Sequence, residues 1–396
     1  MEQKIKICIL GGGFGGFYTA LYFAQSNKSL VEKCQITLVE PKDNFLFSPL
    51  LYEVLTDELK RWEIAPSYQK LLLGYPVDVI KDKVTRVEFS NKEVLLQNNV
   101  ALNYDYLVIA VGRKVNFPPI EGLKEYALTF RSIEDAEVLK NRLEIFIQSQ
   151  LLQPKIAVIG GGANGIEIAC KTYDYFSWQN EKNNLKIMPQ LYVIDRGEEI
   201  LENFGKGVQK AAYKALEKRN ISLLLTTDVI EIEQDSIKLK QEDNVSQYPI
   251  DLVLWTAGTA THEWIEDLPC QRNKMGQLLT YSNLKLIDYP EVLAVGDVAS
   301  IKNQKEPTTA QVAYQQASTA AKNLQAMIQR KSLKKFSYLH LGNMMTLGKG
   351  KAIISSFGIN IVGTIGGFLR RLIYVFRLPT MQHRLKVLKN LLFGYS

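Results

Sequence analysis

A glycine-rich loop that occurs twice is the feature that most constrains the fold of this chain. Each copy follows a short apolar run, KIKICIL or KIAVI, and precedes a segment with helical potential. Both copies have glycine at the first, third and sixth positions of the loop: Gly11, Gly13 and Gly16, then Gly160, Gly162 and Gly165. Glycine permits the tight turn, the approach of backbone N–H groups to a pyrophosphate and close helix–strand packing. The repeat therefore predicts an α/β fold with two dinucleotide-binding units.

An acidic residue ends the strand that follows each loop. ITLVE ends at Glu40, and LYVID ends at Asp195. A carboxylate at this place can accept hydrogen bonds from the ribose hydroxyls of a dinucleotide whose pyrophosphate lies at the helix N-terminus. Asp195 favours the unmodified ribose of NADH, whereas the guanidinium of Arg196 can pair with the 2′-phosphate of NADPH, so both donors stay open.

Three apolar strands with small residues near their ends extend the pattern. YDYLVIAVG ends with Ala110 and Gly112, and DLVLWTAGT has Gly258 at the matching place in the second half. A third run, EVLAVGDVA, contains Asp297 and belongs to neither half by counting. Because both halves share the order of loop, acid-ended strand and small-residue strand, we predict two Rossmann-like domains, one nested in the other.

A segment rich in glutamine and alanine, TTAQVAYQQASTAAKNL, follows the third strand and has helical spacing. Gln311 and Gln315 lie one helical turn apart and therefore share a face. Two interpretations stay open, a solvated surface or a helix whose first turn faces a cofactor.

The cysteines argue against several kinds of site. Cys8, Cys34, Cys170 and Cys270 form no CxxC pair and have no metal-ligand spacing, so we expect no disulfide framework, no metal centre and no dithiol redox centre. Cys8 and Cys170 lie in apolar runs and are expected to be small buried residues. The N-terminus has no signal-peptide pattern, and we expect the chain to fold in a reducing compartment.

Charge is unevenly distributed along the chain. No acidic residue occurs after Glu306, yet 13 of the 48 lysines and arginines do. This asymmetry predicts an anionic partner for the C-terminal part, either nucleic acid or a membrane surface.

The pattern between these basic residues favours the membrane surface. The uncharged run from Ala352 to Leu369 is interrupted by glycines and is expected to form a strand, a turn and a helix start. One apolar helical stripe follows, flanked by Arg384, Lys386 and Lys389; it consists of Leu378, Met381, Leu385, Leu388 and Leu392. We expect a helix in the membrane interface, with no role in nucleic-acid binding. A docked helix or a homodimer contact stays an alternative.

Taken together, these motifs resemble the type II NAD(P)H dehydrogenases, which are FAD-dependent quinone reductases of the two-domain flavoprotein fold. The resemblance runs from about Lys4 to the C-terminus and includes AQVAYQQ, which matches the family's AQxAxQQ signature. FLFSPLLYEVLTDELKRWEIAP and RLIYVFRLPTMQHRL are similar to the cyanobacterial and plastid branch, whose members are described as demethylphylloquinone reductases.

The resemblance implies roles for residues already named and for a few more. FAD would be held by Gly11, Gly13, Gly16, Glu40, Pro49, Leu50, Ala110, Gly112, Asp297, Ala310 and Gln311. The nicotinamide donor would be held by Gly160, Gly162, Gly165, Asp195, Arg196 and Gly258. Gln311 and Gln315 would line the quinone pocket, and Glu167 matches a family glutamate between nicotinamide and flavin. Glu167 could relay a proton or act electrostatically; its alternative is a structural hydrogen bond.

The expected activity is transfer of a hydride from NAD(P)H to FAD and two-electron reduction of a prenylated quinone, with demethylphylloquinone as acceptor and NADPH as the donor that the branch favours. Alternatives are a respiratory NADH:plastoquinone dehydrogenase, a soluble flavin reductase or thiol-linked oxidoreductase, and a flavoprotein redox sensor with little turnover. The expected domains are FAD binding at 1–120 and 285–350, NAD(P)H binding at 150–275, and membrane association at 351–396. The expected location is the cytoplasmic face of a thylakoid or plasma membrane.

Overall fold

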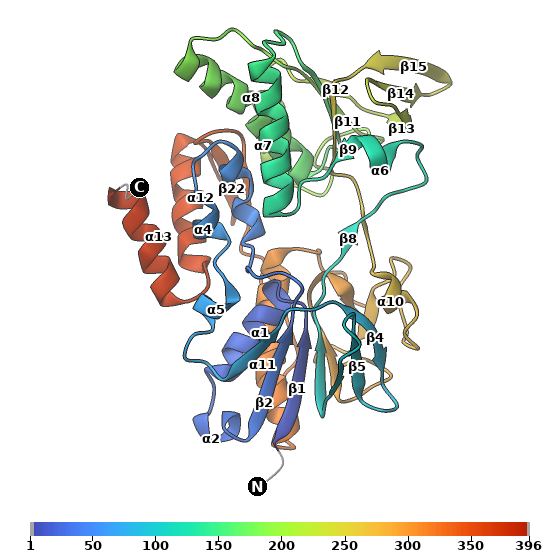
Figure 1. Cartoon of the computed structure of the whole chain (residues 1–396), viewed down its shortest axis with the longest axis vertical. Coiled ribbons are helices and arrows are strands. Elements are labelled where there is room, and N and C mark those ends of the chain that lie inside the picture. The colour runs from blue at the N-terminus through green and yellow to red at the C-terminus, as the bar shows by residue number, and fades with distance from the viewer. Residues whose placement is uncertain (1–3, 394–396) are drawn as a thin grey trace. The chain divides into compact units, whose positions relative to one another are not determined.

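A computed structural model of the chain describes residues 4–393, which divide into two compact units (Figure 1). Unit 1 contains residues 4–46, 65–114 and 259–339, and unit 2 contains residues 47–64, 115–258 and 340–393. Residues 47–64 thus belong to the same unit as the second glycine loop, although we expected them within the FAD-binding domain. The units are defined by packing, so the cofactor domains themselves stay a prediction.

Unit 1 is built on a parallel sheet with the strand order β19-β7-β1-β2-β3. The strands of this sheet are β1 (Ile5–Leu10), β2 (Cys34–Val39), β3 (Val77–Ile80), β7 (Tyr106–Ile109) and β19 (Val292–Ala294). The last four residues of β1 are all buried, as expected for a strand covered on both faces.

Helices and a second sheet cover the parallel sheet of unit 1. The two long helices α1 (Phe14–Ala24) and α11 (Ala310–Ile328) pack on each other. An antiparallel sheet shares one buried cluster with β1 and β2; it consists of β4 (Val84–Glu88), β5 (Glu93–Leu96) and β6 (Ala101–Asn103). The smaller elements are α2 (Lys28–Val31), α5 (Tyr68–Leu71), α10 (Glu263–Glu266), β17 (Thr259–Ala260), β18 (Leu278–Thr280), η2 (Gly296–Val298) and β20 (Ala299–Ile301).

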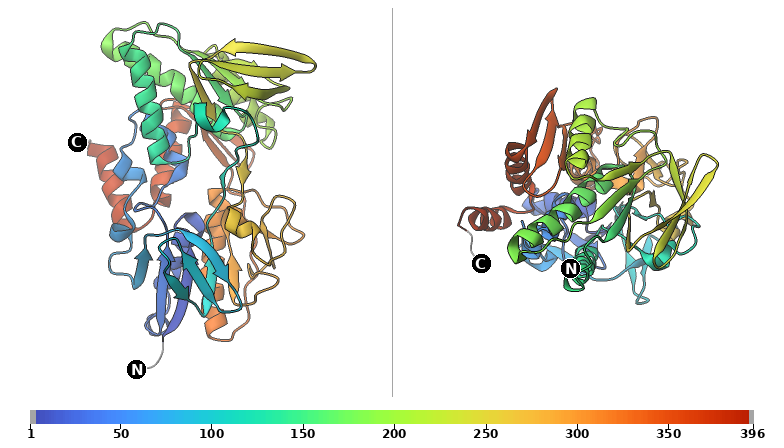
Figure 2. Two further views of the ribbon diagram at one scale, coloured as in Figure 1. Left: turned by 45° about the vertical axis from the view of Figure 1, so that its right-hand side comes forward. Right: turned by 90° about the horizontal axis from the view of Figure 1, so that it is seen from above.

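Unit 2 repeats the parallel architecture with the strand order β12-β11-β10-β16-β9. These strands are β9 (Ala127–Leu128), β10 (Lys155–Ile159), β11 (Gln190–Ile194), β12 (Ser222–Leu224) and β16 (Leu252–Trp255). The helices around it are α6 (Leu123–Tyr126), α7 (Ile133–Gln148), α8 (Ala163–Asn183) and α9 (Lys206–Glu217). An antiparallel sheet, drawn in yellow in Figure 2, consists of β13 (Thr227–Ile232), β14 (Ser236–Gln241) and β15 (Asn244–Pro249). The predicted fold class of two Rossmann-like units is confirmed.

Two further segments complete unit 2. The first contains η1 (Ser48–Leu50), α3 (Tyr52–Leu55) and α4 (Arg61–Ile64), and α3 packs on α7 and α8. The second is the C-terminal segment, which consists of β21 (Asn343–Thr346), β22 (Ala352–Ser356), β23 (Ile359–Gly363), α12 (Thr364–Arg377) and α13 (Met381–Phe393). Its three strands pair antiparallel. Strand β8 (Lys114–Val115) spans the point in the sequence where a segment of unit 1 ends and a segment of unit 2 begins.

The uncharged run in the C-terminal segment forms β22, β23 and the start of α12. We predicted one strand, a turn and a helix start, and the structure has two strands before the helix. The stripe prediction was wrong at Leu378, which lies in the link between α12 and α13 and is fully buried. Pro379 follows Leu378 in that link and favours a break in the helix. Among residues 4–393, no helix combines the length and apolar character needed to cross a bilayer.

Candidate active site

The first glycine loop closes on itself and leaves space in front of α1. Gly11 has φ +94°, and a Cβ on Gly16 would lie 1.9 Å from the Gly11 carbonyl oxygen. A Cβ on Gly13 would meet no protein atom within 4 Å, although Gly13 is the N-cap of α1. Gly11 and Gly16 therefore serve the fold, whereas Gly13 borders open space beside the first N–H groups of the helix, where a pyrophosphate fits.

The second loop has the same construction within unit 2. Gly160 has φ +117°, and a Cβ on Gly165 would lie 1.8 Å from the Gly160 carbonyl oxygen. Gly162 is the N-cap of α8, and a Cβ there would again meet nothing within 4 Å. Both loops therefore pass the steric test for a dinucleotide.

The two acidic residues hold the loops that precede them. Glu40 Oε2 accepts a hydrogen bond from the Gly12 N–H at 2.6 Å, and Asp195 Oδ2 accepts one from the Gly161 N–H at 2.5 Å. The second oxygen of Asp195 accepts a bond from the Gly197 N–H at 2.7 Å. Burial raises the pKa of Glu40, and its hydrogen bonds to backbone N–H groups oppose that shift. Each carboxylate is thus fixed beside the loop, where a ribose would lie.

Tyr68 is a member of this site that the sequence did not reveal. Its hydroxyl donates to the Gly12 carbonyl oxygen at 2.8 Å, and a Cβ on Gly12 would lie 2.3 Å from that hydroxyl. Tyr68 lies on α5, far from the loop in sequence, and no motif marks it. Burial raises its pKa well above the ordinary value, so it is a neutral donor.

Two glutamines form hydrogen bonds with η2, the short turn that contains Asp297. Gln316 Oε1 accepts a hydrogen bond from the Gly296 N–H at 2.7 Å, and Gln277 Nε2 donates to the Asp297 carbonyl oxygen at 2.9 Å. Gln316 is buried on α11. Both glutamines therefore position this turn, and neither was expected to do so from the sequence.

Gln311 and Gln315 lie on α11 in unit 1, and both contact the segment that ends at Leu339. Gln311 Oε1 accepts a hydrogen bond from the Tyr338 hydroxyl at 2.7 Å. Gln315 donates to the Leu339 carbonyl oxygen at 2.8 Å and accepts from its N–H at 3.0 Å. The amide of Gln315 therefore has a structural role, and its place in a quinone pocket stays a prediction.

The other predicted site residues lie in two groups. In unit 1, Ala110 is buried against the first loop, since its carbonyl oxygen would lie 2.6 Å from a Cβ on Gly11. In unit 2, Leu50 is buried and Arg196 is exposed. Gly112 and Gly258 both have positive φ, and Ala310 begins α11.

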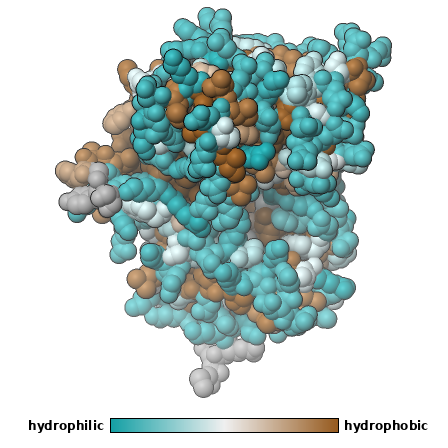
Figure 3. Space-filling model, turned by 45° about the horizontal axis from the view of Figure 1, so that its top comes forward, coloured by the Kyte–Doolittle hydropathy of each residue, from teal (hydrophilic) through white to brown (hydrophobic). Residues whose placement is uncertain are grey.

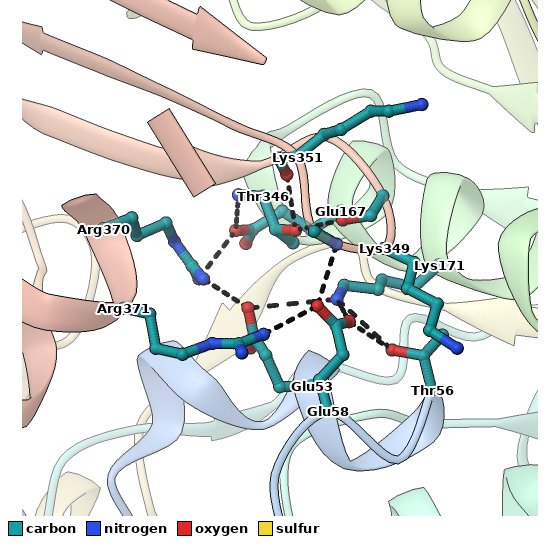
Figure 4. A network of polar contacts seen from close by, with 12 residues as sticks. Glu53, Thr56, Glu58, Glu167, Lys171, Thr346, Lys349, Lys351, Arg370 and Arg371 are labelled. Carbon is teal, nitrogen blue, oxygen red and sulfur yellow. Dashed lines mark hydrogen bonds and ion pairs between the residues drawn. The ribbon is translucent and has the colours of Figure 1, made fainter. Parts of the chain in front are cut away.

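Glu167 on α8 is a buried carboxylate of unit 2, and charged side chains surround it. Its Oε1 accepts a hydrogen bond from the Thr346 N–H at 2.8 Å and lies 3.5 Å from a guanidinium nitrogen of Arg370. Arg370 also pairs with Glu53 Oε1 (Figure 4). Sequence reasoning found Glu167 but neither Glu53 nor Arg370, because the three come from α8, α3 and α12.

A second set of ion pairs continues from this group. Lys171, one turn after Glu167 on α8, is fully buried and pairs with Glu58 Oε2, while Arg371 donates to Glu58 Oε1 at 2.9 Å. Figure 4 shows the two sets side by side between α3, α8 and α12. Three carboxylates and three cations therefore lie together in unit 2, and a buried carboxylate of this kind needs such partners.

The environment of Glu167 moves its proton affinity into the neutral range. Burial raises the pKa of Glu167 to about 7, and this effect exceeds the opposing effects of Arg370 and of the Thr346 N–H. The negative charge of Glu53 raises it further, and Lys171 lowers it. A carboxyl group with this pKa can take up and release a proton near neutral pH.

Residues 5–317 match the family described as pyridine nucleotide-disulphide oxidoreductase. The chain belongs to this family. The predicted enzyme class, a flavoprotein oxidoreductase with FAD and a nicotinamide donor, is confirmed.

Relatives within the family narrow the resemblance. The demethylphylloquinone reductase NdbB of Synechocystis sp. is 37% identical over 98% of this chain and 95% of its own length. An alternative NAD(P)H-ubiquinone oxidoreductase C1 of Arabidopsis thaliana is 32% identical over 98% of this chain and 80% of its own. The structure of NDH2 from Plasmodium falciparum with NADH has a TM-score of 0.87 at 21% identity and covers 99% of both chains, which shows a shared fold.

Figure 3 shows hydrophobic residues in brown on one face of the molecule, and the C-terminal segment exposes many apolar side chains. We call them the C-terminal apolar surface; its members are Phe357, Ile359, Val362, Ile365, Phe368, Phe376, Met381, Leu385, Leu392 and Phe393. The last helix, α13, contacts α4 through polar groups, since His383 Nε2 lies 2.7 Å from the Glu63 carbonyl oxygen and Asn390 donates to Glu63 Oε1 at 3.1 Å. Helix α13 therefore docks through these polar contacts and through its buried Val387, and it leaves other apolar residues at the surface.

Proposed function

We propose that the chain is an FAD-dependent NAD(P)H:quinone oxidoreductase that reduces demethylphylloquinone, a prenylated naphthoquinone, to its quinol in phylloquinone biosynthesis. The observation that carries the proposal is the pair of closed glycine loops, each with its own anchored carboxylate. Two loops of one construction suit two dinucleotides, of which one stays bound and the other exchanges. The quinone acceptor is supported by the relatives named above.

We assign the first loop to FAD and the second to the nicotinamide donor. Glu40, Asp297 and the first turn of α11 lie with the first loop in unit 1, as a resident cofactor with a long binding surface needs. When bound, FAD accepts a hydride from the donor and transfers two electrons to the quinone. Among the residues implied by the resemblance, Ala310, Gln311, Pro49 and Leu50 would contact the flavin.

For the donor, the fixed carboxylate of Asp195 supports NADH. Both of its oxygens accept backbone hydrogen bonds, so its charge cannot move away from a 2′-phosphate. Glu202 lies next to it, since its Oε1 would be 2.5 Å from a Cβ on Gly197. Arg196, the next residue, favours NADPH. The local charge thus outweighs the preference for NADPH that the branch resemblance suggested.

We assign the proton of quinone reduction to Glu167. One NAD(P)H, one proton and one quinone give one NAD(P)⁺ and one quinol, so each turnover takes up one proton. Glu167 is buried and has a pKa of about 7, which suits repeated protonation. Gln311 and Gln315 are proposed as the polar lining of the quinone pocket.

The C-terminal apolar surface supports attachment to an anionic membrane, from which a prenylated quinone can enter. It combines exposed aromatic and aliphatic side chains with the basic residues Arg384, Lys386 and Lys389. Apolar burial together with attraction to anionic lipid is the usual requirement for stable peripheral binding. We therefore propose a peripheral enzyme at the cytoplasmic face of a thylakoid or plasma membrane, with no nucleic-acid partner; a homodimer is compatible with this surface.

Steady-state kinetics test the proposal. The FAD-loaded protein would be given NADH or NADPH together with a short-chain demethylnaphthoquinone, its ring-methylated counterpart, or a plastoquinone analogue. We expect the highest kcat/KM with the demethylnaphthoquinone. Preference for the plastoquinone analogue would indicate a respiratory dehydrogenase, and flavin reduction without quinone turnover would indicate a redox sensor; either result contradicts the proposal.

A further inference from the structure

One buried guanidinium, that of Arg370, joins three parts of unit 2. Arg370 is 3% exposed and lies on α12. One of its terminal nitrogens pairs with Glu53 on α3, and the other donates to the Pro49 carbonyl oxygen in η1 at 2.6 Å. That second nitrogen also lies 3.5 Å from Glu167 Oε1 on α8. Arg370 thus contacts Glu167 and Pro49, both predicted to lie in the reaction site.

Among the described residues, Arg370 and Glu53 each have a buried polar atom without a hydrogen-bond partner, which is unfavourable for an ion pair with a purely structural role. These atoms are Arg370 Nε and Glu53 Oε2. Buried ion pairs stabilise a fold weakly or not at all, because desolvation offsets much of the attraction. Native proteins satisfy nearly all such groups, so the exceptions often mark functional sites.

We propose that Arg370 is a positioning residue, which holds the Glu167 carboxylate and the Pro49 backbone in one arrangement and sets how readily Glu167 takes up a proton. The inference rests on the proposed function, in which Glu167 supplies the proton for quinone reduction. If Arg370 has this role, the C-terminal segment has two functions: it carries the apolar surface, and it contributes a positioning residue to the site.

The charges around Glu167 determine in which direction each variant should shift the pH at which Glu167 titrates. The groups that face it are Arg370 and Tyr374 from α12, Glu53 and Tyr52 from α3, and Cys170 and Lys171 from its own helix. Arg370 favours the carboxylate and has the larger effect, whereas Glu53 favours the protonated form. Loss of Arg370 should therefore raise the pH at which Glu167 titrates, and loss of Glu53 should lower it.

The test uses variants with opposite expected signs. Arg370→Met alone would leave Glu53 buried without its cation and could impair folding, so it is combined with Glu53→Gln. Glu53→Gln alone is the variant of opposite sign. Arg371→Gln is the matched control, because Arg371 is the next residue on α12 but pairs with Glu58.

Infrared spectroscopy of the FAD-loaded protein would follow the carboxylic C=O band that disappears in Glu167→Gln. We expect this band to titrate at least about one pH unit higher in the Arg370→Met, Glu53→Gln protein, lower in Glu53→Gln, and unchanged in Arg371→Gln. The high-pH limb of quinone turnover should shift in the same way. An unshifted band would overturn the inference even if quinone is reduced, whereas absent quinone turnover with a shifted band would overturn only the proposed function.

Discussion

The backbone N–H of Gly12 donates to Glu40 Oε2 at 2.6 Å. In unit 2, the Gly161 N–H donates to Asp195 Oδ2 in the same way. Both carboxylates therefore hold a glycine loop, and in the proposed function each also presents an oxygen to a ribose. Because the task is duplicated, variants of equivalent residues can separate the two dinucleotide sites.

The glycines of the first loop should separate folding from FAD binding. Gly16→Ala places a methyl group 1.9 Å from the Gly11 carbonyl oxygen, so we expect a destabilised protein. Gly13→Ala meets no protein atom and should fold, but its methyl group would enter the space assigned to the pyrophosphate. Thermal unfolding and bound FAD per chain would be measured for both. Normal FAD content in Gly13→Ala would contradict the assignment of this loop.

Asp195 should determine whether the protein prefers NADH or NADPH. We expect kcat/KM to be at least about tenfold higher with NADH than with NADPH, because the fixed carboxylate repels a 2′-phosphate. Asp195→Asn should narrow this ratio, and Arg196→Ala should lower NADPH use while leaving NADH use intact. A wild-type preference for NADPH that survives Arg196→Ala would contradict the role of both residues.

Glu167 should make the stability of the protein depend on pH. Its folded-state pKa of about 7 lies above the ordinary value of 4.5, so the folded protein binds the extra proton between these values. The free energy of unfolding should therefore fall as pH rises from about 4.5 to 7, by roughly 3 kcal/mol. Glu167→Gln should remove this slope in urea unfolding, whereas Glu217→Gln, at an exposed position on α9, should keep it. A slope unchanged in Glu167→Gln would show that the group titrates elsewhere.

The C-terminal apolar surface should bind lipid. The triple variant Phe368→Ser, Phe376→Ser, Leu385→Ser removes side chains that are 59–68% exposed. We expect its affinity for phosphatidylglycerol vesicles to fall at least about 100-fold, with NADH:ferricyanide activity retained. Leu152→Ser, 68% exposed outside this surface, is the control. Equal sedimentation of both variants with vesicles would exclude this surface as the attachment site.

Local patterns in the sequence predicted most of the fold correctly. Glycine spacing, acid-ended strands and the small-residue strands lie within short windows, and each has one physical explanation that predicts its structure. Because these short patterns occur twice in the same order, they predict two units, each with its own glycine loop. Leu378 shows where apolar spacing misleads, since it continues the spacing of α13 but lies in the link before that helix.

Contacts between distant segments could not be predicted in this way. RRLIYVFR begins with two adjacent arginines that look alike in sequence, yet the side chain of Arg370 is 3% exposed and that of Arg371 is 29% exposed. We interpreted the late basic residues as a surface for anionic lipid, and Arg370 instead faces two buried carboxylates. Tyr68 and Gln316 are similar cases, because their partners are backbone groups of remote loops.

The most direct test of the account is an anaerobic stopped-flow experiment on the FAD-loaded protein. One equivalent of NADH would reduce the bound flavin, and a short-chain demethylnaphthoquinone would then be mixed in while flavin absorbance is recorded. The account predicts complete reoxidation at a rate no slower than kcat, with one quinol formed per NADH. Flavin that stays reduced in the presence of the quinone would contradict it.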